Sequence, residues 1–355
     1  MITNADKQIS VIIPVYNCAE FLNRAVQSVL EQDYKKTDII LVDDGSTDGS
    51  AELCDELAEN NSGIVVIHQK NSGASSARNT GMNEVFSRNV EEESYITFLD
   101  ADDAWKTAFF NETVSELMKK EYDLIGFQAC LCNHDLNRRA ESVPLKEGIY
   151  KGGRASLWIH GAQCFGAMLY KCSFLKQYGI HFKKLKCSED KIFSMTCLYL
   201  ADSIYLGNRL MYLYRQNAVS VMHNRSWGIP YYSSIMEAYL NWDEEMTVWE
   251  TSERGQLEEG SLLAKIYLKD MMDEHFQMGG NKKQFKEYVQ NDPNCQKILS
   301  LMSQKERSMT EELQYSLRYR LKNRAKGLVR KVCLKLKGNK AIQVWLDRQR
   351  YPIEL

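Results

Sequence analysis

Four short apolar segments, each followed directly by a group of polar residues, dominate the first third of this 355-residue chain. The segments are 9–14, 38–43, 64–67 and 95–99, and residues with helical spacing separate each one from the next. Strands that are apolar throughout and alternate with amphipathic helices indicate a parallel sheet that is covered on both faces. In such sheets ligands bind beyond the carboxyl ends of the strands, so the polar residues there are the first candidates for function.

The polar groups at the expected strand ends are rich in carboxylates and amides. In chain order they are Pro14-Val-Tyr-Asn17, Asp43-Asp44-Gly45-Ser46, Asn71-Ser-Gly73 with Ala77-Arg78-Asn79, and Asp100-Ala101-Asp102-Asp103. Carboxylates that converge on one edge repel each other unless a cation joins them. A divalent metal with hard oxygen ligands suits such a place, and a diphosphate would complete its coordination shell. Arg78, near an expected helix N-terminus, suits a phosphate or the oxygens of a nucleotide.

Any one of these clusters, taken alone, is equally consistent with a structural role. Thr47 and Asp48 look like the N-cap of a helix that continues to about Ala58, and Asp43 and Asp44 could be turn residues. The range Asp100–Asp103 could likewise be a helix cap. Four polar groups in order, each at the end of a strand, favour a binding site over four unrelated caps.

Taken together, these motifs resemble those of the family 2 glycosyltransferases, which have a GT-A fold. The resemblance is dense over residues 9–128 and thinner to about residue 221. It implies a Rossmann-like α/β fold with a mostly parallel sheet flanked by helices. It also implies an inverting transferase that moves a sugar from a nucleotide sugar to a hydroxyl group.

The resemblance assigns the nucleotide to residues at three strand ends. Tyr16, two residues after Pro14, would stack on the base, and Asp44 would hydrogen-bond it. A carboxylate acceptor suits the imide N–H of uracil, so a UDP-sugar is the favoured donor. Arg78 would lie near the same nucleotide.

The fourth strand end would bind the metal. By the same resemblance Asp100-Ala101-Asp102 forms the family's D-x-D element, which holds Mg²⁺ or Mn²⁺ on the diphosphate. Asp102 would be the direct ligand of the cation, with Asp100 beside it, and Asp103 would lie close to the donor sugar.

A Glu-Asp pair further along the chain, Glu189-Asp190, matches the remaining signature of the family. The resemblance implies that Asp190 is the general base that takes a proton from the acceptor hydroxyl. An inverting transfer needs such a base, and neighbouring carboxylates raise its pKa towards a useful range. Without the resemblance, the pair would be interpreted as the cap of a helix that starts near Lys191.

Two further segments are less informative. Tyr214-Arg215-Gln216 resembles the closing segment of the domain, where an arginine can meet a phosphate. Phe165-Gly-Ala-Met168 stands where many relatives carry a tryptophan. This stretch is expected to face the acceptor, so the identity of the acceptor does not carry over from the family.

Proteins of other classes also place acids after apolar strands. A D-x-D-x-T/V phosphatase would have Thr or Val where this chain has Ala104, and a Rossmann dehydrogenase would need a G-x-G-x-x-G motif after its first strand. A processive synthase would need membrane-spanning helices, and no apolar run approaches the required length. A sugar-nucleotide-binding protein without catalytic activity stays open as the alternative.

The second half of the chain has mostly helical patterns. Apolar residues recur at helical spacing over 231–249, 262–272 and 285–301, with a break at Asp292-Pro293. We therefore expect a catalytic domain over residues 1–221 and a helical subdomain over 222–316. A basic tail would follow over 317–355.

The basic tail departs from the composition of the rest of the chain. The net charge of the whole chain is −2, but residues 318–355 contain twelve Lys and Arg against two acids. Apolar residues from Leu317 to Leu336 follow helical steps, and a basic amphipathic helix suits an anionic membrane surface. A solvated helix packed on the body and a nucleic-acid patch are the alternatives, but no aromatic interleaving supports nucleic acid as a partner.

These features together predict where the protein works. Residues 1–8 lack the apolar core of a signal peptide. We expect a cytoplasmic protein that is peripheral on the inner face of the plasma membrane, held there by 317–350. Its acceptor would be a glycan or lipid-linked glycan in surface polysaccharide synthesis.

Overall fold

The protein is described here by a computed structural model. The structure describes residues 7–34, 36–88, 94–141, 146–153, 156–157, 165–215, 229–251, 259–277 and 281–304. Contacts divide them into two compact units. The described residues up to 215, with 249–251, belong to the first unit, and those of 229–248 and from 259 onwards belong to the second.

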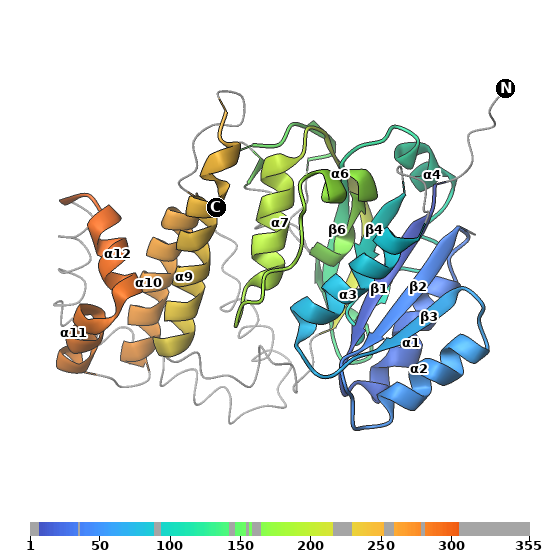
Figure 1. Cartoon of the computed structure of the whole chain (residues 1–355), viewed down its shortest axis with the longest axis horizontal. Coiled ribbons are helices and arrows are strands. Elements are labelled where there is room, and N and C mark those ends of the chain that lie inside the picture. Colours follow the sequence, from blue (N-terminus) through green and yellow to red (C-terminus); the bar gives the residue numbers. More distant parts are fainter. Residues whose placement is uncertain are drawn as a thin grey trace. The chain divides into compact units, whose positions relative to one another are not determined.

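The first unit begins with an alternation of strands and helices (Figure 1). Its elements are β1 (Ile9–Val15), α1 (Ala19–Leu30), β2 (Thr37–Asp43), α2 (Ser50–Glu59), β3 (Ile64–His68), α3 (Ala74–Ser87) and β4 (Tyr95–Phe98). β1 pairs in parallel with both β2 and β4, and β2 pairs in parallel with β3. The four predicted strands are confirmed to within one residue at each end.

Both faces of this parallel sheet are covered, because alternate residues of β1 point to opposite sides. Ile13 belongs to the core cluster that contains Leu22 and Val26 of α1. Ile12 faces α3, and a Cβ added to Gly81 would lie only 2.5 Å from Ile12 Cγ2. Glycine therefore lets α3 approach the sheet closely. Arg78 is part of this helix, so the close packing also places Arg78 near the sheet.

The sheet continues with strands from later in the chain. The remaining elements are β5 (Ala104–Trp105), α4 (Glu112–Met118), β6 (Leu124–Cys132), β7 (Arg138–Glu141), β8 (Gly148–Tyr150), the 3₁₀ turn η2 (Phe165–Ala167), β9 (Met168–Lys171), α6 (Cys172–Gln177), α7 (Glu189–Leu200) and β10 (Ile204–Arg215). Among the described residues the strand order is β3-β2-β1-β4-β9-β6-β10-β5, with β7 beside β6 and β8 beside β10. β9 is antiparallel to both β4 and β6, whereas β10 is parallel to β6. The α/β class is confirmed, and the sheet is mixed in this half.

The second unit is helical. It contains α9 (Ile229–Met246), α10 (Glu259–Gln277), α11 (Lys282–Asn291) and α12 (Pro293–Leu301), and a 3₁₀ turn, η3 (Thr247–Trp249), follows α9. The predicted break at Asp292 is confirmed, because the Asp292 side chain caps α12 and Pro293 occupies its first turn. Within the described part of the chain, no helix is long and apolar enough to cross a membrane. The predicted basic tail, 317–355, lies outside the described residues.

Candidate active site

The loop after β1 is tied to the loop after β2. Asn17, which has a φ of +48°, accepts a hydrogen bond from the Thr47 N–H at 2.8 Å through Oδ1. Its own N–H donates to Ser46 Oγ at 3.1 Å. Pro14 is half-buried within β1, whereas Tyr16 is 53% exposed at the carboxyl edge of the sheet. A large exposed ring on a braced loop is a suitable platform for stacking.

Asp44 joins the end of β2 to the entry of α3. Its carboxylate accepts hydrogen bonds from Gln69 Nε2 at 2.6 Å, the Ser72 N–H at 2.9 Å and the Gly73 N–H at 2.8 Å. The residue is only 3% exposed. Gly73 has a φ of +90°, a conformation that favours glycine. A carboxylate at a helix N-terminus is well stabilised, so Asp44 first of all fixes this turn.

Asp48 has a different place from the one that its spacing predicts. α2 begins at Ser50 with Gly49 as its N-cap, so Asp48 is not the N-cap residue. The Asp48 carboxylate instead accepts from the Ser50 N–H at 3.0 Å and from the Ala19 N–H at 3.1 Å. It thereby connects the starts of α1 and α2, and these contacts outweigh its burial and lower its pKa.

Asp43 forms a pair with His68 at the ends of two adjacent strands. His68 Nδ1 lies 3.0 Å from Asp43 Oδ2, and His68 Nε2 lies 3.1 Å from Asp55 Oδ1. Burial raises the pKa of Asp43, but hydrogen bonds from His68 and Ser46 outweigh it and the net pKa is lowered. Hydrogen bonds to the two carboxylates raise the pKa of His68.

The turn after β4 presents three aspartates in different environments. Asp103 is 1% exposed and accepts hydrogen bonds from the Tyr212 hydroxyl at 2.6 Å and the Arg215 N–H at 2.7 Å. Burial and the charges of Asp102 and Asp100 raise the pKa of Asp103 well above its ordinary value. Asp100 and Asp102 are half-buried, and Ala101 between them is buried.

Arg78, on α3, connects this turn to the start of α7. Its Nη2 donates to Asp100 Oδ1 at 2.8 Å, and its Nη1 lies 3.6 Å from Glu189 Oε1. Burial lowers the pKa of the guanidinium, but the charges of Asp100, Glu189 and Asp190 outweigh this and raise the pKa. One buried cation therefore brings together two carboxylates, Asp100 and Glu189, that lie 89 residues apart in the sequence.

Glu189 and Asp190 form the first turn of α7. Ser188, just before them, has a φ of +63°, an uncommon conformation for a residue other than glycine. Burial and the charge of Asp190 raise the pKa of Glu189, although Arg78 opposes this rise. The pair thus follows a sharp turn of the backbone and lies at the N-terminus of a helix. A helix N-terminus favours negative charge.

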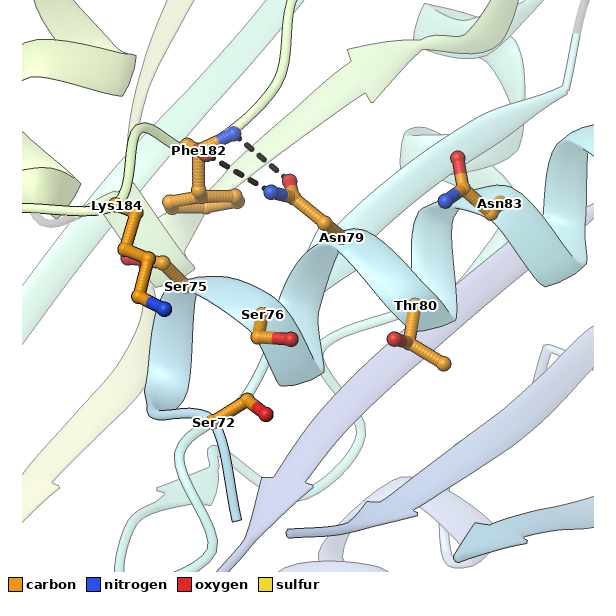
Figure 2. Close-up of a pocket in the computed structure, with 8 residues that line it drawn as sticks. All are labelled: Ser72, Ser75, Ser76, Asn79, Thr80, Asn83, Phe182 and Lys184. Atoms are coloured by element: carbon orange, nitrogen blue, oxygen red, sulfur yellow. Dashed lines mark hydrogen bonds between the residues drawn. The ribbon is translucent and has the colours of Figure 1, made fainter. Parts of the chain in front are cut away.

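A polar pocket lies along α3, beside the loop that precedes α7 (Figure 2). Its volume is about 370 Å³, and it is lined by Ser72, Ser75, Ser76, Asn79, Thr80, Asn83, Phe182 and Lys184. The predicted aspartates do not line it. The Asn79 side chain closes one wall, since it donates to the Phe182 carbonyl and accepts from the Phe182 N–H, each at 2.8 Å.

The structure adds residues that the sequence pattern did not single out. Tyr212 bonds to Asp103 and also accepts from the Asp100 N–H at 3.2 Å. Arg215, expected only to meet a phosphate, donates from Nε to the Asp102 carbonyl at 2.5 Å. An aromatic residue in an apolar strand is typical of a core, so no sequence signal distinguished Tyr212.

The described residues can supply part of a metal site. Among them, no group of three or more His, Cys, Asp or Glu side chains is arranged to hold an ion by itself. Both carboxylate oxygens of Asp103 already accept hydrogen bonds. The candidate metal ligands at this turn are therefore Asp100 and Asp102. Mg²⁺ is commonly bound by one or two carboxylates together with substrate phosphates, so this pair fits a cation that a diphosphate completes.

Comparison with known proteins places the chain in a family. Residues 10–179 match the model of Glycosyl transferase family 2. TarP of Staphylococcus aureus strain N315, a poly(ribitol-phosphate) β-N-acetylglucosaminyltransferase, is 30% identical over 249 residues, which cover 66% of this chain and 71% of TarP. The chain belongs to glycosyltransferase family 2, and it is a glycosyltransferase.

Two further proteins extend the comparison. Glycosyltransferase GlyA of Streptococcus pneumoniae serotype 4 is 27% identical over 246 residues, which are 66% of this chain but 34% of GlyA. The chain thus spans about a third of the length of that relative. The structure of S. aureus TarS 1–349 with UDP-GlcNAc superimposes with a TM-score of 0.59 at 19% identity, covering 90% of this chain and 89% of TarS 1–349. This likeness shows the GT-A fold.

Proposed function

We propose that this chain is an inverting, metal-dependent glycosyltransferase that moves a sugar from a UDP-sugar to an acceptor hydroxyl. The observation that carries the proposal is the grouping of Asp100 with Glu189-Asp190 around Arg78. A transferase of this kind needs a diphosphate site and a basic carboxylate within reach of one anomeric carbon. The turn after β4 would supply the first, and the start of α7 would supply the second.

The donor nucleotide would lie on the loops after β1 and β2. Tyr16 is exposed on the braced loop, two residues after Pro14, and the base would stack on its ring. Asp44 would accept from the uracil imide while its other contacts hold the turn at 70–73. The names of two relatives agree with a UDP-sugar, since TarS was solved with UDP-GlcNAc and TarP is an N-acetylglucosaminyltransferase.

Asp102 and Asp100 would hold a Mn²⁺ or Mg²⁺ ion. Such an ion, when bound, neutralises the negative charge that develops on the leaving diphosphate. Asp102 would be the direct ligand of the ion, and Asp100, whose Oδ1 accepts a hydrogen bond from Arg78, would lie beside it. Asp103 would keep the turn in shape close to the donor sugar through its contacts with Tyr212 and Arg215.

Asp190 would act as the general base towards the acceptor hydroxyl. It lies in the first turn of α7, where its neighbour Glu189 adds a second negative charge. A carboxylate within reach of the acceptor hydroxyl can take its proton in the transition state. Direct displacement by the activated hydroxyl would invert the configuration at the anomeric carbon.

The acceptor would be a glycan or a lipid-linked glycan in the synthesis of a surface polysaccharide. TarP, by its name, acts on poly(ribitol-phosphate), and this supports a polymer acceptor here. The basic segment 317–350 would attach the enzyme to anionic lipids on the inner face of the plasma membrane. No nucleic-acid partner is part of the proposal.

A donor panel tests the proposed function. Release of the nucleoside diphosphate is measured from UDP-, GDP- and dTDP-sugars, with Mn²⁺ or Mg²⁺ and with EDTA. We expect turnover of a UDP-sugar that EDTA abolishes. Binding of UDP without turnover of any donor, in the presence of candidate glycan acceptors, would instead establish a non-catalytic sugar-nucleotide-binding protein.

The membrane contact is tested on the full chain with vesicles. We expect the protein to sediment with vesicles that contain phosphatidylglycerol and not with pure phosphatidylcholine. A matched variant replaces Arg318, Arg320, Lys322 and Arg324 by glutamine and should lose this preference. Equal sedimentation of both proteins would rule out the basic segment as the anchor.

A further inference from the structure

The guanidinium of Arg78 is buried at the meeting point of two acidic segments. The residue is 6% exposed, and its carboxylate partners come from the end of β4 and the start of α7. Within the described part of the protein, Nε and Nη1 make no hydrogen bond. The cation therefore interacts by charge with Glu189 and by one strong hydrogen bond with Asp100.

Two aromatic rings fix the position of this guanidinium. Its central carbon lies 4.8 Å from the centre of the Phe165 ring and 5.3 Å from that of Phe182. Phe182 in turn stacks on Phe193 of α7, with ring centres 4.0 Å apart and an interplanar angle of 4°. Cations over ring faces are held by attraction as well as by packing. The ring of Phe182 thus contacts both Arg78 and the helix that begins with Glu189.

The residue next to Arg78 secures the loop that leads to α7. The side-chain amide of Asn79 makes two hydrogen bonds with the backbone of Phe182, one to its carbonyl and one from its N–H (Figure 2). Six residues later the backbone turns through the positive φ of Ser188 and enters the helix. Two adjacent residues of α3 therefore fix both ends of the segment 182–189.

We propose that Arg78 is a positioning residue, which holds Glu189 and with it Asp190 at a set distance from Asp100. This inference rests on the proposed function, in which Asp190 is the base and Asp100 belongs to the diphosphate site. It differs from the expectation that Arg78 lies against the nucleotide, because the guanidinium is buried between its carboxylates. Without the cation, Asp100, Glu189 and Asp190 would repel each other and move apart.

The test compares Arg78→Gln and Arg78→Lys in the full chain. We expect Arg78→Gln to lower kcat about 10- to 100-fold, as misplacement of a reacting group does. The affinity for UDP, measured by calorimetry, should change by less than about threefold, because a guanidinium that is held between Asp100 and Glu189 would not serve as a ligand of the nucleotide. The acid limb of the kcat profile should move to higher pH, because the charges of Asp100, Glu189 and Asp190 are no longer offset. Arg78→Lys should recover part of kcat and move the limb back.

Arg88→Gln is the matched control. Arg88 stands at the other end of α3, where it pairs with Asp38 at 2.6 Å and Glu84 at 3.0 Å. The substitution removes the same charge from the same helix, so kcat and its pH profile should stay as in the wild type. Loss of UDP affinity in step with kcat in Arg78→Gln would show a nucleotide ligand and overturn the inference. An unchanged kcat would overturn it as well.

Glu189→Gln covers the case in which Arg78→Gln does not fold. This variant keeps the cation and removes its partner, so kcat should fall while the acid limb moves to lower pH, because Asp190 loses a negative neighbour. In a double-mutant cycle with Arg78→Lys the two effects should be non-additive, and additivity would overturn the inference. If the wild type turns over no donor, the proposed function fails and this inference falls with it. If the wild type is active and the variants have the same kcat and pH profile as the wild type, this inference fails while the proposed function stands.

Discussion

The hydroxyl of Tyr212 donates a hydrogen bond to Asp103 Oδ2 at 2.6 Å and accepts one from the Asp100 N–H at 3.2 Å. One side chain of β10 thus bonds to both ends of the turn that carries the three aspartates. The Arg215 N–H, from the same strand, donates to Asp103 Oδ1 at 2.7 Å. The shape of the proposed metal turn therefore depends on a strand that is distant in sequence.

Tyr212→Phe should destabilise the protein and weaken catalysis. The change leaves the buried Asp103 carboxylate and the Asp100 N–H each without one partner, which costs about 1–3 kcal/mol in the free energy of unfolding. Urea denaturation measures this cost, and donor hydrolysis should fall because the turn relaxes. Tyr205→Phe is the control, since its hydroxyl bonds the exposed Glu147 and its loss should cost about 0.5 kcal/mol or less. Equal effects of the two variants would contradict the role of Tyr212.

Gly166→Ala should disturb the same turn from a second side. A Cβ at this position would lie 2.4 Å from Tyr212 Cε2 and 2.9 Å from the Phe98 carbonyl oxygen. Overpacking of this kind costs about 1–3 kcal/mol in unfolding free energy and displaces the ring. Gly63→Ala provides the comparison, because the nearest atom to its added Cβ is 3.8 Å away. A fully stable and active Gly166→Ala variant would mean that the ring of Tyr212 has room to move.

The parallel half of the sheet could be predicted because its strands are apolar along their whole length. Such strands need cover on both faces, and the intervening helices supply it. The other half could not be predicted in the same way. β9 has four residues and pairs antiparallel with β4 and β6, and nothing in a segment so short specifies its neighbours.

The candidate site divides along a similar line. Aspartates at the strand ends could be recognised because the topology of a parallel sheet brings those ends to one edge. The partnership of Arg78 with Glu189 joins residues 111 positions apart, so only the folded chain reveals it. Asp48 was expected as a cap from its spacing alone, whereas the structure uses it to connect two helices.

Asp190→Asn should abolish sugar transfer while leaving UDP affinity nearly intact. The amide keeps the size of the side chain but cannot accept a proton from the acceptor hydroxyl. Transfer is measured with the preferred UDP-sugar, and calorimetry reports the affinity for UDP. Asp202→Asn, two residues beyond the C-terminal end of α7, serves as the control for an acid-to-amide change and should leave transfer unaffected. More than a few per cent of residual transfer in Asp190→Asn would show that another group is the base.

Asp102→Ala should remove the dependence of UDP binding on Mn²⁺. The wild-type chain should bind UDP more tightly with the ion than without it, because the cation joins the carboxylate to the diphosphate. Calorimetry with and without Mn²⁺ measures the difference for both proteins. Asp135→Ala, an exposed acid in the loop after β6, is the matched loss of charge and should keep the dependence. Retained dependence in Asp102→Ala would exclude this residue as the ligand.

His68→Gln should change how stability depends on pH. Hydrogen bonds to Asp43 and Asp55 raise the pKa of His68 above its ordinary value of 6.5, so the folded state holds the proton more tightly than the unfolded state. The stabilisation is therefore complete below about pH 6.5 and is lost as the pH rises through the raised value. Urea denaturation between pH 5.5 and 8.5 should show the wild-type advantage over His68→Gln shrinking with pH. His181→Gln, whose ring faces a backbone carbonyl, should follow the wild type, and a pH-independent advantage would refute the pairing.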